Sequence, residues 1–223
     1  MKADEIASII QGRCVQRGAS DVVVMVLESE EAMVRFSNNE ITVSTDLKDI
    51  TAHVFIYCKE RRAGTNVADL TKRSLESTAD RLVDAAKRSH PSDFYAPLPS
   101  GPFEYDRNLM RAKEVPLDPK TTTSWVRAAI QAAMRSGATR VSGALIVRNL
   151  TLTLRTTGNA HGVAKRSGIE LSLRAFGNGV ASGHAVCIAS KERDFDPVRA
   201  GTEAGHLAKM ANNPVEGTPG SYP

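Results

Sequence analysis

Residues 34–41 read Val-Arg-Phe-Ser-Asn-Asn-Glu-Ile, and this stretch decides what kind of fold the chain can adopt. Asparagine tolerates the left-handed backbone conformation of a two-residue hairpin turn, so Asn38-Asn39 predicts a tight turn between antiparallel strands. Strand-like segments lie on both sides of this turn, at residues 22–27, 32–36, 41–44 and 50–57. The first part of the chain is therefore predicted to be built on antiparallel strands.

Helical periodicity precedes and follows these strands. Residues 3–17 and 69–89 carry apolar side chains at the spacing of one helix face. The residues predicted to face inward are Ala3, Ile6, Ala7, Ile10 and Cys14 in the first helix, and Leu75, Ala79, Leu82, Val83 and Ala86 in the second. The resulting order is helix, strands, helix.

The same order returns after a segment rich in proline. Asp118-Pro119 provides an N-cap and a first-turn proline for a helix that ends at Gly137. Its inward residues are expected to be Trp125, Val126, Ala129, Ile130 and Ala133. Strands are predicted at about 140–148, 150–156, 168–176 and 180–190, and a last helix at about 198–212.

The predicted fold class is mixed α+β, with two units of antiparallel sheet backed by helices. We expect a first domain over residues 1–92, a linker over 93–118 and a second domain over 119–223. The repeated order of elements suggests an internal duplication, although residue identities between the halves are sparse.

Composition places the chain among soluble globular proteins. It has 223 residues, of which 41% are hydrophobic and 24% charged. The net charge is +4, but basic and acidic residues alternate, as in Lys59-Glu60-Arg61-Arg62, and only 5% are aromatic. Specific nucleic-acid binding needs a concentrated basic face and benefits from stacking aromatics, so no specific nucleic-acid partner is expected.

Cellular location is inferred from the cysteines and the N-terminus. Cys14, Cys58 and Cys187 are odd in number and widely spaced, which favours a reducing compartment over a disulfide framework. Residues 1–5 include acids where a signal peptide is basic, and no stretch is long enough to span a membrane. A cytoplasmic protein without a membrane partner is expected.

Glu203 and His206 form the most suggestive pair of metal-ligating residues, because positions i and i+3 share one side of a helix. A helical wheel, however, buries the stripe Ala200, Ala204, Leu207, Ala208 and Ala211, which leaves His206 opposite the stripe and Glu203 at its flank. An exposed helix surface is therefore the favoured interpretation, and a metal site on Glu203 and His206 is the alternative.

Two histidine–cysteine pairs are interpreted in the same way. His53 with Cys58, and His184 with Cys187, have odd spacings within predicted strands, which send the two side chains to opposite faces. The glycines at 158–162 and 177–179 lead into strands rather than into a helix N-terminus, so hairpin turns are favoured over phosphate loops. No catalytic, cofactor-binding or metal-ligating residue is assigned.

Several motifs resemble the N-terminal region of the TldD/PmbA family, known as modulators of DNA gyrase. The resemblance lies in residues 34–41 and 53–89, including the junction Gly64-Thr65-Asn66-Val67-Ala68-Asp69-Leu70. It continues more weakly at residues 157–162 and 193–195 and resumes at 216–223. It therefore extends over nearly the whole chain and is closer to the PmbA type.

The resemblance implies a cytoplasmic two-subunit metalloprotease system that degrades or matures peptides. In that system a TldD-type subunit carries a His-Glu-x-x-x-His zinc motif in its C-terminal region, and a PmbA-type partner lacks it. Residues 1–223 contain no such motif, so the resemblance implies a non-catalytic N-terminal portion that is inactive alone and binds no zinc itself. Its expected partners are further copies of itself or a TldD-type subunit, together with the unfolded peptide substrate of the assembly.

Overall fold

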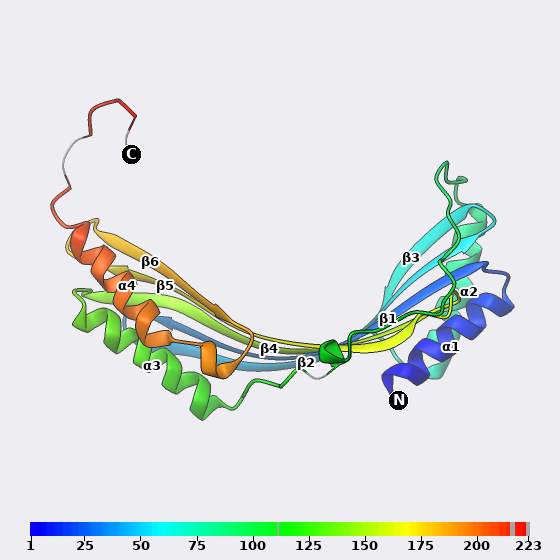
Figure 1. The fold of residues 1–223 in the computed structure, drawn as a ribbon, viewed down its shortest axis with the longest axis horizontal. Coiled ribbons are helices and arrows are strands. Elements are labelled where there is room, and N and C mark those ends of the chain that lie inside the picture. Colours follow the sequence, from blue (N-terminus) through cyan, green and yellow to red (C-terminus); the bar gives the residue numbers. More distant parts are fainter. Residues whose placement is uncertain (111, 215–216, 222–223) are drawn as a thin grey trace. The chain divides into compact units, whose positions relative to one another are not determined.

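The computed structural model describes residues 1–110, 112–214 and 217–221. In the resemblance noted at residues 216–223, Glu216, Tyr222 and Pro223 lie outside the described residues. The elements, shown in Figure 1, are α1 (Ala3–Gln16), β1 (Asp21–Ser37), β2 (Glu40–Cys58), β3 (Arg61–Val67), α2 (Lys72–Arg88), η1 (Arg107–Met110), α3 (Pro119–Arg135), β4 (Arg140–Thr156), β5 (His161–Phe176), β6 (Ser182–Ala189), η2 (Glu192–Asp194) and α4 (Pro197–Met210).

The strands form an antiparallel sheet in the order β3-β2-β1-β4-β5-β6. Asn38 and Asn39 have φ values of 52° and 69° in the turn between β1 and β2, which confirms the predicted hairpin. Asp118 caps α3 by accepting a hydrogen bond from the Thr121 N–H at 2.9 Å, as expected. The mixed α+β fold class, with antiparallel strands backed by helices, is confirmed.

The long strands differ from the prediction, which divided β1, β2 and β4 in two and began β5 at residue 168 rather than at His161. In β1, Val22, Val24 and Val26 are buried, residues 27–31 are partly exposed, and Ala32, Val34 and Phe36 are buried again. The hydrophobic pattern therefore breaks between two buried stretches while the backbone stays extended. The prediction also missed β3, because its sequence Arg-Arg-Ala-Gly-Thr-Asn-Val shows no clear apolar alternation.

Two compact units share these strands. Unit 1 contains residues 1–30, 48–113 and 149–166, and unit 2 contains residues 31–47, 114–148 and 167–223. This division differs from the expected contiguous segments 1–92, 93–118 and 119–223. The physical reason is strand length: 17 residues of β1 extend over roughly 55 Å, which is more than one small hydrophobic core can cover.

Unit 1 has a core between α1, α2 and one face of the sheet. Ile6, Ile10 and Cys14 of α1 pack with Leu75 and Val83 of α2 on the buried valines of β1 and β2, as the helical periodicity predicted. Burial raises the pKa of the Cys14 thiol to about 12, so this cysteine is an inert core residue.

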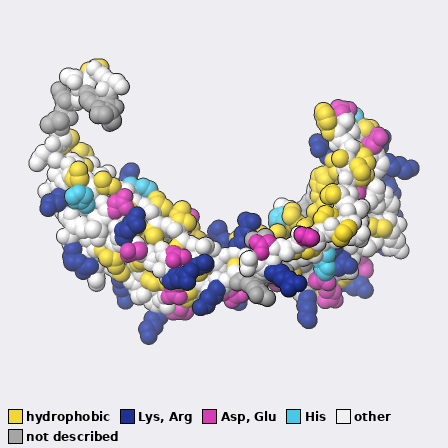
Figure 2. Space-filling model, viewed as in Figure 1, with side chains coloured by type: hydrophobic (Ala, Val, Ile, Leu, Met, Phe, Trp, Pro, Cys, Tyr) yellow, Lys and Arg dark blue, Asp and Glu magenta, His cyan; other side chains and the backbone are white. Residues whose placement is uncertain are grey.

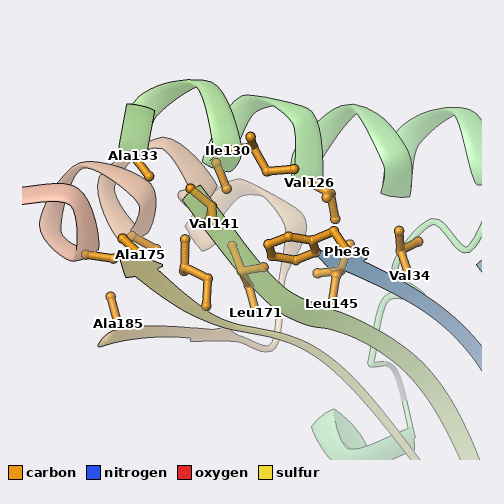
Figure 3. Close-up of a cluster of buried hydrophobic side chains, with 14 of the residues drawn as sticks. Val34, Phe36, Val126, Ile130, Ala133, Val141, Leu145, Leu171, Ala175 and Ala185 are labelled. Atoms are coloured by element: carbon orange, nitrogen blue, oxygen red, sulfur yellow. The ribbon is translucent and has the colours of Figure 1, made fainter. Parts of the chain in front are cut away.

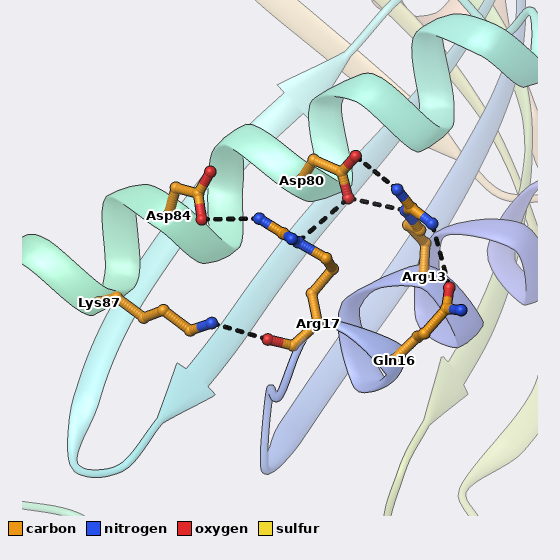
Figure 4. A network of polar contacts seen from close by, with 6 residues as sticks. All are labelled: Arg13, Gln16, Arg17, Asp80, Asp84 and Lys87. Carbon is orange, nitrogen blue, oxygen red and sulfur yellow. Dashed lines mark hydrogen bonds and ion pairs between the residues drawn. The ribbon is translucent and has the colours of Figure 1, made fainter.

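Charged side chains join the two helices of unit 1 at their exposed rim (Figure 4). Arg13 donates two hydrogen bonds to the Asp80 carboxylate, each 2.7 Å long. Arg17 lies 3.5 Å from Asp80 and donates to Asp84 at 3.0 Å, while Lys87 donates to the Arg17 carbonyl at 2.8 Å. The network fixes how α1 aligns along α2.

Unit 2 has its own core beneath α3 and α4, part of which is drawn in Figure 3. Phe36 of β1 packs among Val126 of α3, Leu145 of β4 and Leu171 of β5. Gly143 makes room for that ring, because a Cβ atom at residue 143 would lie 2.7 Å from the Phe36 Cζ. Trp125 stacks edge-on against Phe195 with 5.1 Å between the ring centroids.

Candidate functional site

The metal-site alternative on α4 gains no support from the structure. Glu203 and His206 are both exposed, as the helical wheel predicted. Within residues 1–110, 112–214 and 217–221, no three His, Cys, Asp or Glu side chains gather in a way that could hold a metal ion.

The buried stripe of α4 differs from the prediction at Leu207 and at Ala211, which is only partly buried and follows the last residue of the helix. Leu207 is 40% exposed, whereas Gly201 and Gly205 are buried. A Cβ atom on Gly201 would lie 2.2 Å from the Ala129 carbonyl oxygen, and one on Gly205 would lie 2.3 Å from the Ala133 carbonyl oxygen. The two glycines let α4 approach the backbone of α3, while the Leu207 Cβ lies beside Gly183 of β6.

The histidine–cysteine pairs lie on opposite strand faces, as predicted. His53 is partly exposed and its Nδ1 lies 2.7 Å from the Asn66 Oδ1 on β3, while Cys58 is buried. His184 is exposed and its Nε2 lies 3.1 Å from the Ser172 Oγ, while Cys187 packs against the core. Neither pair can share a ligand.

The glycine-rich segments are hairpin turns. Asn159 has a φ of 65° between β4 and β5, and Gly179 has a φ of 58° between β5 and β6. Gly158 also touches another segment, because a Cβ atom there would lie 2.4 Å from the Pro99 carbonyl oxygen.

That contact shows that much of the predicted linker packs on unit 1. Tyr95 donates a 2.5 Å hydrogen bond to Asp21, and this bond raises the pKa of Tyr95. The Leu98 N–H donates to the same carboxylate at 3.3 Å, and the Tyr105 hydroxyl accepts from the His161 N–H at 3.1 Å. The segment is therefore a fixed part of the unit 1 surface.

The sheet face opposite α1 and α2 is apolar in unit 1. Val54 and Ile56 point into the core, so the alternation of β2 places Phe55 and Tyr57 on the other face. Phe55, Tyr57 and Tyr95 form a row with ring centroids 5.3 and 4.9 Å apart. A groove of about 310 Å³ lies beside this row; its lining residues include Val23, Met25, His53, Phe55 and Thr65.

Unit 2 has a second apolar surface on β6. Ala185 and Ala189 are buried beneath α4, whereas Val186 and Ile188 are 47% and 72% exposed on the opposite face. Hydrophobic side chains are visible at the surface in Figure 2, where Lys and Arg are interspersed with Asp and Glu.

Sequence reasoning did not single out these two surfaces, although a signal was present. Val54-Phe55-Ile56-Tyr57 and Ala185-Val186-Cys187-Ile188 are apolar at every position, whereas a strand with one solvated face alternates. Such runs mark strands whose second face is available for another contact. Both surfaces hold exposed apolar groups, which on protein surfaces commonly mark contacts with another protein.

A polar cluster in unit 1 joins α1 to the β4–β5 hairpin. The Asp4 carboxylate accepts from Arg155 at 3.1 Å and lies 2.8 Å from the His161 Nε2, while Arg155 also donates to Gln11 at 2.8 Å. Partial burial raises the pKa of Asp4, but the His161 and Arg155 contacts outweigh it and lower the pKa overall. The cluster positions the start of α1.

None of the described helices is both long and apolar enough to cross a membrane.

Several solved structures resemble this chain. No family model and no curated protein sequence matches the chain. Among solved structures, a proposed modulator of DNA gyrase from Bacteroides thetaiotaomicron matches 90% of this chain with a TM-score of 0.75 and 13% identity. A second proposed modulator, from Thermotoga maritima, matches 93% with a TM-score of 0.70 and 14% identity.

A third similar structure is TldE from Thermococcus kodakarensis, which matches 92% of this chain with a TM-score of 0.72 and 11% identity. At these identities the likeness shows the fold. The fold is that of TldD/PmbA-type proteins, as the resemblance in the sequence implied. The chain spans 48%, 48% and 47% of the lengths of these three proteins.

Proposed function

We propose that this chain is the N-terminal portion of a PmbA-type, non-catalytic subunit in a cytoplasmic metalloprotease system. The observation that carries the proposal is the fold match over 90% of the chain to proteins about twice its length. The chain would contribute assembly surfaces, and a TldD-type partner would supply the zinc and the activated water. Together they would form the enclosure that admits an unfolded peptide.

The apolar sheet surfaces support an assembly role. Phe55 and Ile188 expose large apolar side chains on strands whose helix-covered faces are already buried. Exposed apolar surface of this kind typically marks a protein-binding site. It suits a subunit that works by contact with another chain.

Co-expression of the tagged chain with a TldD-type subunit tests this proposal. We expect the two chains to purify as one complex, with a mass by light scattering equal to a sum of whole subunits. Replacing Phe55 with Asp should weaken this complex, while the matched control Lys72→Asp, on an exposed helix surface, should not. Failure of the unmodified chain to co-purify with any TldD-type subunit would contradict the proposal.

A stand-alone binding module is the second candidate, and one cavity favours it. The cavity, in unit 1, has a volume of about 360 Å³ and is lined by residues that include Tyr105, Leu152, Leu154 and Val163. Small-ligand sites are typically of this size, with apolar walls and few polar groups. Saturable binding of a fluorescent apolar probe, abolished by Leu154→Glu, would support this candidate if no subunit co-purifies.

A further inference from the structure

Another pocket of unit 1 lies between α1 and the β4–β5 hairpin. Its volume is about 430 Å³, which is within the usual range for small-molecule sites. The residues that line it include Gln11, Gly12, Val15, Arg155, Thr157 and Asn159. All of them belong to unit 1, so this unit forms the pocket by itself.

The guanidinium group of Arg155 is held in position from two sides. Its Nε donates to the Gln11 Oε1 at 2.8 Å, and its Nη1 donates to the Asp4 carboxylate at 3.1 Å. Within the described part of the chain, no protein atom accepts a hydrogen bond from Nη2. A guanidinium carries five N–H groups in a planar fork, so the edge formed by Nη1 and Nη2 keeps donors for a ligand.

The other polar side chains of the pocket also retain donors. The Gln11 Oε1 already accepts from Arg155, and the Thr157 Oγ1 already accepts from the Val22 N–H at 3.0 Å, which leaves the Gln11 NH₂ group and the Thr157 hydroxyl hydrogen. The side-chain amide of Asn159 makes no hydrogen bond with any described residue. None of the described lining residues is Asp or Glu. The ligand that fits this pocket is therefore a hydrogen-bond acceptor.

The charge around the pocket favours a singly charged anion. The Asp4 carboxylate lies 3.1 Å from Arg155 and 2.8 Å from the His161 Nε2, and it offsets the charge of the guanidinium. A phosphate dianion would be repelled by Asp4 more strongly than a carboxylate would. A carboxylate also matches the two parallel N–H groups of a guanidinium edge.

One side of the pocket is apolar and is formed by α1. Val15 is 46% exposed, and a Cβ atom at Gly12 would meet nothing within 4 Å. The helix therefore leaves open space beside an exposed valine. An apolar group attached to the carboxylate can lie there and remove part of the Val15 side chain from water.

We propose that this pocket binds a carboxylate that carries an apolar group, with the carboxylate oxygens on the Nη1–Nη2 edge of Arg155 and the apolar group against Val15. The Gln11 and Asn159 amides donate further hydrogen bonds to the carboxylate. Such a group occurs in short-chain carboxylic acids and at the C-terminus of a peptide, and the same contacts recognise both. The inference is independent of the proposed function, because it uses only contacts within unit 1.

NMR titration of the full chain with butyrate, and separately with N-acetylleucine, tests the inference. Both carboxylates should shift the amide signals of Gln11, Gly12 and Asn159 in a saturable manner. N-acetylleucinamide has the same apolar group without the negative charge and should bind at least about tenfold more weakly than N-acetylleucine, because it loses the charged hydrogen bonds to Arg155.

Three variants test the individual contacts. Arg155→Lys keeps the charge but loses the planar fork, so it should weaken the binding of both carboxylates by roughly tenfold. Asn159→Gly removes the amide and still tolerates the φ of 65°, and it should weaken binding by roughly threefold or more. Gly12→Leu should fill the open space and block binding. Its matched control is Gly168→Leu, where a Cβ atom also meets nothing within 4 Å, and this variant should bind normally.

Two of these variants keep the test independent of the folding of α1. Arg155→Lys could also loosen the start of α1, because Arg155 contacts Asp4 and Gln11. Gly12→Leu and Asn159→Gly leave those contacts in place. Circular dichroism should show that both variants remain folded.

The relative affinity of the two probes identifies the source of the ligand. Tighter binding of N-acetylleucine would assign the C-terminus of a peptide, and tighter binding of butyrate would assign a free carboxylic acid. Four results would overturn the inference: signal shifts that do not saturate, equal binding of N-acetylleucinamide, tighter binding of inorganic phosphate than of both carboxylates, or affinities unchanged by Gly12→Leu and Asn159→Gly.

Discussion

At the scale of single residues, the helical glycines show how position decides the effect of one methyl group. Gly12 lies in α1, exposed, and a Cβ atom there would meet nothing within 4 Å. Gly205 lies in α4, buried, where a Cβ atom would meet the Ala133 carbonyl oxygen at 2.3 Å. The intrinsic helix propensity favours alanine equally at both places. The surroundings must therefore determine whether replacing the glycine with alanine stabilises or destabilises the protein.

We expect Gly12→Ala to stabilise the protein by roughly 0.5–1 kcal/mol, which is the gain in helix propensity. Gly205→Ala should instead destabilise it by about 1–3 kcal/mol, because α4 must move away from α3. Urea denaturation of both variants measures the two effects. Equal gains in stability would show that α4 does not pack against α3 as described.

A second residue-scale prediction concerns Asp80. Its hydrogen bonds from Arg13 hold the pKa of the carboxyl below its ordinary value. A carboxyl with a lowered folded-state pKa contributes stability above its unfolded pKa of about 3.9, and that contribution is lost as the pH falls through the folded pKa.

Asp80→Asn should therefore be less stable than the unmodified chain at pH 7, and the difference should shrink below about pH 4. Urea midpoints measured from pH 7 down to pH 3 would show this convergence. A difference that stays constant over the whole range would mean that the Arg13 contact does not depend on the charge of Asp80.

At the scale of elements, the start of α3 follows directly from its capping residues. Asp118 accepts from the Thr121 N–H, which satisfies a backbone donor that the helix leaves unpaired. This hydrogen bond also lowers the pKa of Asp118.

Replacing Asp118 with Ala removes the cap and should cost about 1 kcal/mol of stability, whereas Asp118→Asn should retain most of it because an amide oxygen also caps well. Guanidinium unfolding curves of both variants provide the measurement. A similar loss in both would locate the effect in the charge rather than in the hydrogen bond.

At the scale of the whole molecule, the interleaving of the two units has a consequence for dissection. Unit 1 takes residues 149–166 from the second half of the chain, and unit 2 takes residues 31–47 from the first half. A cut after Lys113 would therefore separate Phe36 from the rest of the unit 2 core, and it would separate residues 149–166, which include the buried Thr153, from the rest of unit 1.

We expect the fragments 1–113 and 114–223 to lack cooperative unfolding transitions when each is expressed alone. Mixing or co-expressing them should restore a cooperative transition, because each supplies the missing strands of the other. Circular dichroism during thermal unfolding would show whether each fragment alone, and the mixture of the two, has a cooperative transition. Independent folding of either fragment would favour the contiguous division into residues 1–92 and 119–223.

The sequence by itself determined the local structure of this protein. Helical periodicity identified the buried face of α2, and Asn38-Asn39 and Asp118-Pro119 identified a turn and a helix start, because these signals act within a few residues. It also separated His53 from Cys58, and His184 from Cys187, since strand alternation needs no tertiary information.

Only the tertiary structure decided which segments share a core. Residues 28–31, Glu-Ser-Glu-Glu, suggest the end of a strand, yet β1 continues through them because sheet pairing holds an extended backbone that its own side chains do not bury. Likewise, the burial of Gly201 and Gly205 depends on how closely α4 approaches the backbone of α3. Strand pairing and helix approach join residues far apart in the sequence, so no local pattern can specify them.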